Sequence, residues 1–217
     1  AWWTAGEDHS RDGWARVDPW LAALGPRLPV ELGEQEARRA ARPWLALLEA
    51  IGSGPKLTAA GYLPPSVVEQ IADAAGVSDW WIGKANREDL TWPVAALRQA
   101  AQDVGLLRKA KGTLTPTARA RAVGGDPREL VVTVLSRLPL GKGFALEAGW
   151  FALLGRAAGA TGADLDDGVA RILTDRGWRT DGHAPVSPIQ AHASAQATID
   201  LLQMMAGGPR EFDPALL

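Results

Sequence analysis

One pattern occurs twice in this chain of 217 residues, at a constant offset, and it constrains the fold more than any other feature. The first copy runs from Asp103 to Pro116 and the second from Asp175 to Pro188. Each copy has a Gly shortly after the Asp and ends with Leu or Val, a hydroxyl residue and Pro. Each follows a helical stretch and precedes another. The pattern therefore predicts a helix stopped by Gly, two strands joined by a turn, and a helix started by Pro. This order is typical of the wing of a winged-helix unit.

The segments around both copies have the hydrophobic spacing of amphipathic helices, with Pro near their starts and Gly after their ends. Residues 56–58 could add one short strand before the first copy. We predict a mainly α-helical protein with two tandem winged-helix-like units, each carrying a short β-hairpin. The helices are expected at 34–52, 64–76, 91–104, 126–138, 144–158, 164–175 and 188–206.

Three domains follow from this order. Residues 1–33 form an irregular, Trp-rich N-terminal extension with one short helix near 18–24. Residues 34–123 form the first winged-helix-like unit, and residues 124–217 form the second. The ten Trp residues are several times the usual share, and we expect most of them to pack in cores or between units.

Composition excludes several classes of protein. The absence of Cys excludes a disulfide framework and fits a reducing compartment. A net charge of −2 argues against an indiscriminately polybasic protein. No apolar stretch reaches the roughly 18 residues of a membrane helix, and no signal peptide opens the chain. We therefore expect a cytoplasmic protein with no membrane partner. The chain starts at Ala1 rather than Met, which is compatible with its being part of a longer protein.

Three segments resemble a known family. They are 56–68 (KLTAAGYLPPSVV), 81–89 (WIGKANRED) and 105–117 (GLLRKAKGTLTPT), and Gly177–Trp178–Arg179 also fits. Together they resemble uncharacterised actinobacterial proteins, some of which carry a domain named after an open reading frame of an Agrobacterium-type root-inducing plasmid. The resemblance covers roughly residues 40–206. It implies a cytoplasmic bacterial protein, and it brings no activity and no catalytic residues.

Phosphate and metal sites find little support. Residues 52–58 (GSGPKLT) contain the Gly, Lys and Thr of a P-loop but lack its G-x-x-x-x-G-K-[ST] spacing. Pro55 also removes a backbone N–H donor that a phosphate would need. The three His residues are not spaced as metal ligands, and no Cys is present to help them. Residues 164–168 hint at a calcium loop but lack its other oxygen ligands and the closing Glu. We predict no cofactor and no metal.

A hydrolytic triad is equally poorly supported. Ser187, His192 and Asp181 are present around the second wing, but no signature of a hydrolase surrounds them. The adjacent carboxylates at 88–89 and 166–167 would point in different directions on a helix, as solvated helix starts do. We therefore expect a protein that is not an enzyme.

Nucleic-acid binding is the function with positional support. Residues 56–123 carry 9 basic and 6 acidic side chains, whereas the segments before and after them are acidic on balance. In a winged helix the third helix enters the major groove and the wing contacts phosphates. We predict binding to double-stranded DNA by the first unit, as part of a regulatory or accessory protein. The expected contacts come from the third helix (Arg98, Gln99, Gln102), the wing (Arg108, Lys109, Lys111) and the preceding linker (Lys84, Arg87).

The alternative is a protein-interaction or dimerisation module that binds no nucleic acid. The wing of the second unit carries Asp181 and His183, which suits a structural or protein-binding role. Trp80 and Trp81 lie in a linker, where burial would pin the linker and exposure would create an apolar patch for a partner. We favour burial. DNA binding predicts one continuous positive face, and the alternative predicts an exposed apolar patch.

Overall fold

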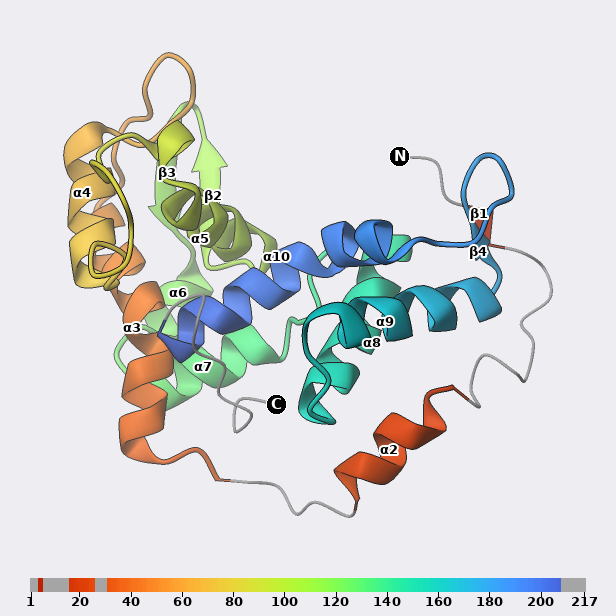
Figure 1. The fold of residues 1–217 in the computed structure, drawn as a ribbon. Helices are drawn as coiled ribbons and strands as arrows, with labels where there is room; N and C mark the ends of the chain where they lie inside the picture. Colours follow the sequence, from red (N-terminus) through yellow and green to blue (C-terminus); the bar gives the residue numbers. More distant parts are fainter. Residues whose placement is uncertain (1–3, 6–15, 26–30, 208–217) are drawn as a thin grey trace. The chain divides into compact units, whose positions relative to one another are not determined.

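A computed structural model describes residues 4–5, 16–25 and 31–207 of the chain (Figure 1). The described part is mainly α-helical, with small two-stranded antiparallel sheets. None of its helices combines the length and the apolar composition that crossing a lipid bilayer requires. The elements are β1 (Thr4–Ala5), α2 (Asp18–Leu24), α3 (Glu34–Ile51), α4 (Pro65–Ala74), the 3₁₀ turn η1 (Glu88–Leu90), α5 (Trp92–Asp103), β2 (Leu107–Ala110), β3 (Thr113–Pro116), α6 (Ala118–Val123), α7 (Pro127–Leu135), α8 (Phe144–Ala157), α9 (Gly162–Asp175), β4 (Trp178–Arg179) and α10 (Pro188–Ala206).

These elements form two compact units, which we describe separately. Unit 1 consists of the described residues within 1–31 and of residues 139–199. Unit 2 consists of residues 32–138 and of the described residues from 200 onward. Helix α10 begins in unit 1 and ends in unit 2. This division differs from the predicted one at 123–124, because α7 packs against α3 and so belongs with the first half of the chain.

The core of unit 2 is built around α3. Its buried face carries Trp44, Leu47 and Ile51, and it contacts α4, α5, β3 and α7. Helix α5 buries Leu97 and β3 buries Leu114, so the helix and the hairpin share one core. Helix α7 starts close to the predicted start at residue 126, because Asp126 caps it by accepting hydrogen bonds from the backbone N–H groups of Arg128 (2.8 Å) and Glu129 (3.2 Å).

Unit 1 is centred on the packing of α8 against α9. Its core includes Phe144 and Phe151 of α8 and Leu173 of α9, and the first turns of α10 add Ala191 and Ala195. The predicted short helix near 18–24 is present as α2, which packs on α8. Trp2, Trp3 and Trp14 of the N-terminal extension lie outside the described residues, so the predicted packing of these side chains stays a prediction.

The sequence repeat is also a repeat of backbone conformation. Gly105 and Gly177 both have positive φ (79° and 94°) and stop the preceding helix. Lys111 and His183 occupy equivalent positions in the two copies, and their φ angles are 49° and 56°. Among the described residues, they are the non-glycine residues with positive φ. The buried positions match as well, in the pairs Leu97/Val169, Ala100/Ile172, Ala101/Leu173 and Leu114/Val186.

The two hairpins nevertheless differ in length. In unit 2, β2 and β3 pair through four residues each, from Leu107 opposite Pro116 to Ala110 opposite Thr113. In unit 1, the second copy forms a single bridge between Arg179 and Pro185. Strand β4 pairs instead with β1, so that Thr4 lies opposite Arg179 and Ala5 lies opposite Trp178. The repeated segment therefore forms a regular two-stranded hairpin in unit 2 and a wider loop in unit 1.

Candidate nucleic-acid interface

The β2–β3 hairpin presents three cations on the surface of unit 2. Lys111 and Gly112 form its turn, and both have positive φ, as a type I′ turn requires. Leu107 and Leu114 are buried and attach the hairpin to the core, whereas Arg108, Lys109 and Lys111 are exposed. All three wing residues predicted from the sequence thus lie on one short, well-anchored hairpin (Figure 1).

A third chain segment completes the sheet and adds a fourth cation. Lys56 forms an antiparallel bridge with Thr113. The N–H of Leu57 donates to the carbonyl of Gly112 (2.8 Å), and the N–H of Leu114 donates to that of Pro55 (3.3 Å). Strand β3 therefore lies between β2 and residues 55–57. The Lys56 side chain is exposed, and it was not among the predicted contacts although a strand at 56–58 was expected.

Arg98 does not face solvent with these cations. Its Nε lies 2.5 Å from Oε1 of Glu88, and the two side chains are 15% and 0% exposed. The other carboxylate oxygen of Glu88 accepts a hydrogen bond from the N–H of Leu63 (2.6 Å), and Nη1 of Arg98 donates to the carbonyl of Gly61 (3.4 Å). A charge taken out of water needs such partners. Arg98 therefore holds η1 and the 61–63 loop together, and this placement does not suit contact with a base.

The loop that Arg98 holds lies next to Lys109. Gly61 has a φ of 85°, and a Cβ at this position would lie 3.4 Å from Nζ of Lys109. The loop is a tight turn, closed by hydrogen bonds from the N–H of Gly61 to the carbonyl of Thr58 (2.8 Å) and from the N–H of Tyr62 to Oγ1 of Thr58 (3.1 Å). Tyr62 is exposed on this loop. The buried ion pair thus supports the surface on which Lys109 lies.

The two predicted Gln residues of α5 are engaged with each other and with an acid. Nε2 of Gln99 donates to Oδ1 of Asp103 (3.0 Å), and Nε2 of Gln102 donates to Oε1 of Gln99 (3.4 Å). Gln99 and Asp103 are exposed. The outer face of α5 therefore combines amides with a carboxylate, which a DNA phosphate would repel.

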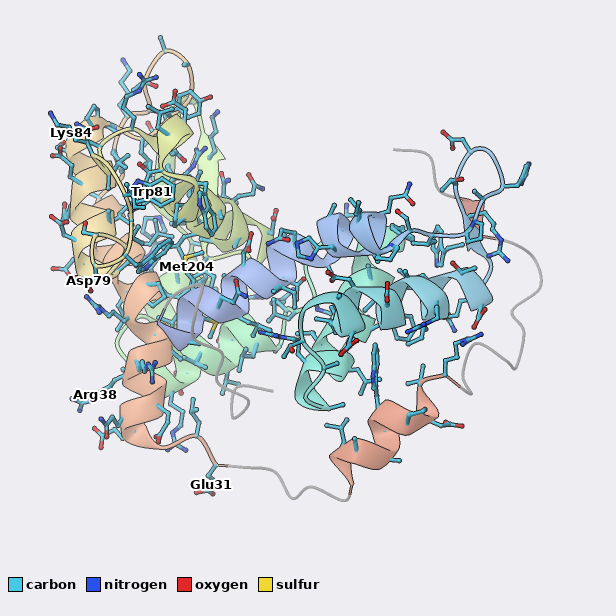
Figure 2. The ribbon with its side chains drawn as sticks, viewed as in Figure 1. Glu31, Arg38, Asp79, Trp81, Lys84 and Met204 are labelled. Carbon is cyan, nitrogen blue, oxygen red and sulfur yellow. The ribbon has the colours of Figure 1, made fainter. Side chains whose placement is uncertain are left out.

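Lys84 and Arg87 lie in the linker between α4 and α5, and both are exposed. Figure 2 places Trp81 beside α5 and Lys84 at the outer edge of the same linker. Arg87 donates from Nε (3.2 Å) and Nη2 (2.6 Å) to the two oxygens of Asp89. These hydrogen bonds raise the pKa of Arg87 and lower the pKa of Asp89. The charge of Arg87 is thus balanced locally, which leaves Lys84 as the cation that this linker offers to an anion.

An apolar patch lies at the start of α5. Trp80 and Trp81 are half-buried and pack with Trp92, the first residue of α5, with ring centroids 6.0–6.3 Å apart. The three indoles thus shield one another, a result intermediate between the burial and the exposure considered for Trp80 and Trp81. Around them, Ile82 is 96% exposed, and Leu90 and Trp92 are also exposed. We call Trp80, Trp81, Ile82, Leu90 and Trp92 the Trp patch.

Residues considered for catalysis have other partners. Ser187 caps α10 reciprocally with Gln190: Oγ of Ser187 donates to Oε1 of Gln190 (2.9 Å), and the N–H of Gln190 donates to that Oγ (3.3 Å). His192 pairs with Asp166 through Nδ1 and Oδ1, 3.1 Å apart. Within 4–5, 16–25 and 31–207, no three His, Asp or Glu side chains converge as metal ligands would, and His9 lies outside these residues.

Comparison with known proteins does not assign the chain to a family or a function. No protein-family model matches the chain, and no curated protein or solved structure matches it significantly. The resemblance based on residues 56–68, 81–89 and 105–117 therefore stays a prediction.

Proposed function

We propose that unit 2 is a winged-helix module that binds double-stranded DNA through its hairpin. The observation that carries the proposal is the cationic hairpin, with Arg108, Lys109 and Lys111 exposed and Lys56 on the adjoining segment. The order of elements supports it: α3, residues 55–57, α4, α5 and the β2–β3 hairpin, with β3 central among the three paired segments. This order is the one expected of a winged helix, and it supports the proposal.

The proposed contact is with phosphates rather than with bases. Base readout would need donors on the outer face of α5, but Arg98 pairs with buried Glu88 and Gln99 bonds Asp103. In helix-turn-helix proteins, the N-terminal residues of the recognition helix contact base edges. The corresponding end of α5 begins with exposed Trp92 and is preceded by exposed Leu90, which offer no hydrogen-bond pattern for a base edge. The hairpin cations need only a phosphate backbone, which every sequence presents. We therefore propose a module with little sequence preference of its own.

The proposal is confined to unit 2. In unit 1 the repeated segment has only the bridge between Arg179 and Pro185, and its strand β4 pairs with β1. The residues equivalent to Arg108, Lys109 and Lys111 are Thr180, Asp181 and His183. This surface lacks the cations on which the proposal depends.

The test is a fluorescence-anisotropy titration of mixed-sequence duplex DNA at several salt concentrations. Four phosphate contacts predict a log–log salt slope of about −3.6. Lys109→Ala/Lys111→Ala removes two of them and should weaken binding roughly 60-fold at 0.1 M salt, with a slope shallower by about 1.8. The matched control is Lys142→Ala/Arg171→Ala, which removes two exposed cations from unit 1. Equal losses in both double variants, or no binding at low salt, would rule out the hairpin as the site.

A second candidate function rests on the Trp patch. An exposed cluster of large apolar side chains around nearly fully exposed Ile82 is unusual on a surface that has no partner. In this alternative the patch mediates association of the chain with itself or with another protein. Sedimentation equilibrium tests self-association with Ile82→Asp/Leu90→Asp, against Ile189→Asp, a control at an exposed Ile in unit 1. The alternative expects association that the patch variant abolishes and the control retains.

A further inference from the structure

Helix α8 in unit 1 is apolar on the side that faces away from the core. Ala148, Phe151 and Ala152 point into the core, whereas Trp150 on the opposite side is 56% exposed and Leu146 is also exposed. The large apolar side chains on this outer side are in contact with water, and a ligand that covered them would be stabilised by the burial of their apolar surface.

Helix α2 covers part of this side and leaves a hollow. A cavity of about 340 Å³ lies between α2 and α8, within unit 1. Its volume falls in the range of small-molecule pockets, which span roughly 300–1,000 Å³. The apolar walls of the cavity are Val17 and Leu21 on one side and Trp150, Phe151 and Leu154 on the other.

The position of α2 is set by Trp20, which leaves the cavity open. The indole of Trp20 lies against Gly155 of α8 and Gly168 of α9. A Cβ at Gly155 would lie 3.0 Å from Cη2 of the indole, and a Cβ at Gly168 would lie 2.5 Å from Cζ2. Two glycines thus make a slot that admits the ring. Because Trp20 sits in this slot and does not line the cavity, α2 is anchored without filling the hollow beside it.

One end of the cavity is polar, and its charges compensate each other. Oε2 of Glu147 accepts hydrogen bonds from Nε of Arg176 (2.8 Å) and from Nε1 of Trp178 (3.2 Å). The guanidinium of Arg176 lies over the ring of Phe151, 5.8 Å from its centroid. Since a cation and an anion already pair here, a charged ligand would gain little and would lose its hydration. This end favours an uncharged ligand.

We propose that this cavity binds an uncharged, aromatic hydrophobic molecule of two or three rings. The ligand would stack on Trp150 and contact Phe151 and Leu154, and Leu21 would close over it from α2. The site lies entirely in unit 1 and does not depend on the DNA-binding proposal for unit 2.

The probes are two dyes with the same aromatic skeleton. N-phenyl-1-naphthylamine is uncharged, and 8-anilinonaphthalene-1-sulfonate adds a sulfonate. The full chain should bind the uncharged dye saturably at one site, with enhanced dye fluorescence, and should bind the sulfonate at least about tenfold more weakly. Equal or tighter binding of the sulfonate would overturn the inferred ligand class, and non-saturable binding would overturn the site.

Two variants localise the dye. Trp150→Ala removes an exposed stacking wall and should weaken binding about tenfold without unfolding the chain. Leu154→Trp fills the cavity and should abolish binding. Ile189→Ala removes an exposed side chain that does not line the cavity and should leave binding unchanged. Circular dichroism confirms that each variant is folded. Unchanged dye binding in Trp150→Ala, or concentration-dependent pairing of chains that displaces the dye, would refute the proposal.

Discussion

The two copies of the repeated segment share a positive φ at equivalent positions but differ in their turns and in the side chains that they present. Lys111 and His183 have the same unusual conformation at equivalent positions, with φ of 49° and 56°. Around Lys111 the chain forms a regular hairpin with exposed cations. Around His183 it forms a wider loop, in which Asp181 stands where the first copy has Lys109. Conformation and surface charge are therefore separable properties of this repeat.

The difference in hairpin length has a local cause and a distant one. Pro185 stands where the first copy has Thr113, and it has no N–H to donate to a paired strand. The loop closes instead through Thr180, whose N–H donates to the carbonyl of Ala184 (3.0 Å) and whose Oγ1 accepts from the N–H of Ala184 (3.2 Å). The distant cause is β1, which pairs with β4. Position in the tertiary structure thus gives one pattern two outcomes.

The largest effect on stability is expected when the buried ion pair of unit 2 is broken, in comparison with the more exposed ion pair of unit 1. Arg98→Met leaves the carboxylate of Glu88 buried without its cation, and should destabilise unit 2 by about 3–5 kcal/mol. Arg176→Met in unit 1 affects a more exposed pair and should cost about 1 kcal/mol. Urea unfolding measures both. The double variant Glu88→Leu/Arg98→Met should recover most of the loss, because no charge is then left unpaired. Similar costs for the two single variants would contradict the burial argument.

An intermediate effect is expected when the charges of the two hairpins are exchanged. Lys109→Asp places in unit 2 the residue that unit 1 carries at the equivalent position, and should weaken DNA binding roughly 60-fold at 0.1 M salt. Lys109→Asp/Asp181→Lys restores the net charge of the chain. If binding returned in this double variant, net charge rather than the position of the cation would control affinity. Fluorescence anisotropy distinguishes the two outcomes.

The smallest effect concerns the positive φ that Lys111 and His183 share. Asn tolerates positive φ better than Lys, and Gly112 follows Lys111, so Lys111→Asn gives the preferred Asn-Gly sequence of a type I′ turn. Lys111→Asn should therefore stabilise the protein by about 0.5 kcal/mol, which thermal unfolding can resolve. His183→Asn should change the stability little, because His also tolerates positive φ and Ala184 follows it. Lys111→Ala is the control and should not stabilise, and equal gains from Lys111→Asn and His183→Asn would contradict this difference between the two turns.

Local chemistry explains why much of the helical fold could be predicted from the sequence. The predicted starts and stops of α3, α4, α8 and α10 agree with the structure to within a residue or two. Asp126 caps α7, and Gly105 ends the helical segment before β2. These signals act within one turn of the chain, through capping hydrogen bonds, the fixed φ of Pro and the freedom of Gly. The repeat likewise predicted one turn in each copy, and the structure has turns that include Lys111 and His183.

Long-range partners decided the features that sequence patterns left open. Arg98 belongs to the residues of the third helix that we predicted to contact DNA, but Glu88 and the 61–63 loop enclose it. The pairing of α7 with α3, and of β4 with β1, also depends on segments far apart in the chain. The sequence by itself determined which residues form turns, which residues cap helices and which segments are helical. Only the tertiary structure decided which charges are buried and where α2 and α8 line an open cavity, because burial is a property of the neighbours that folding brings together.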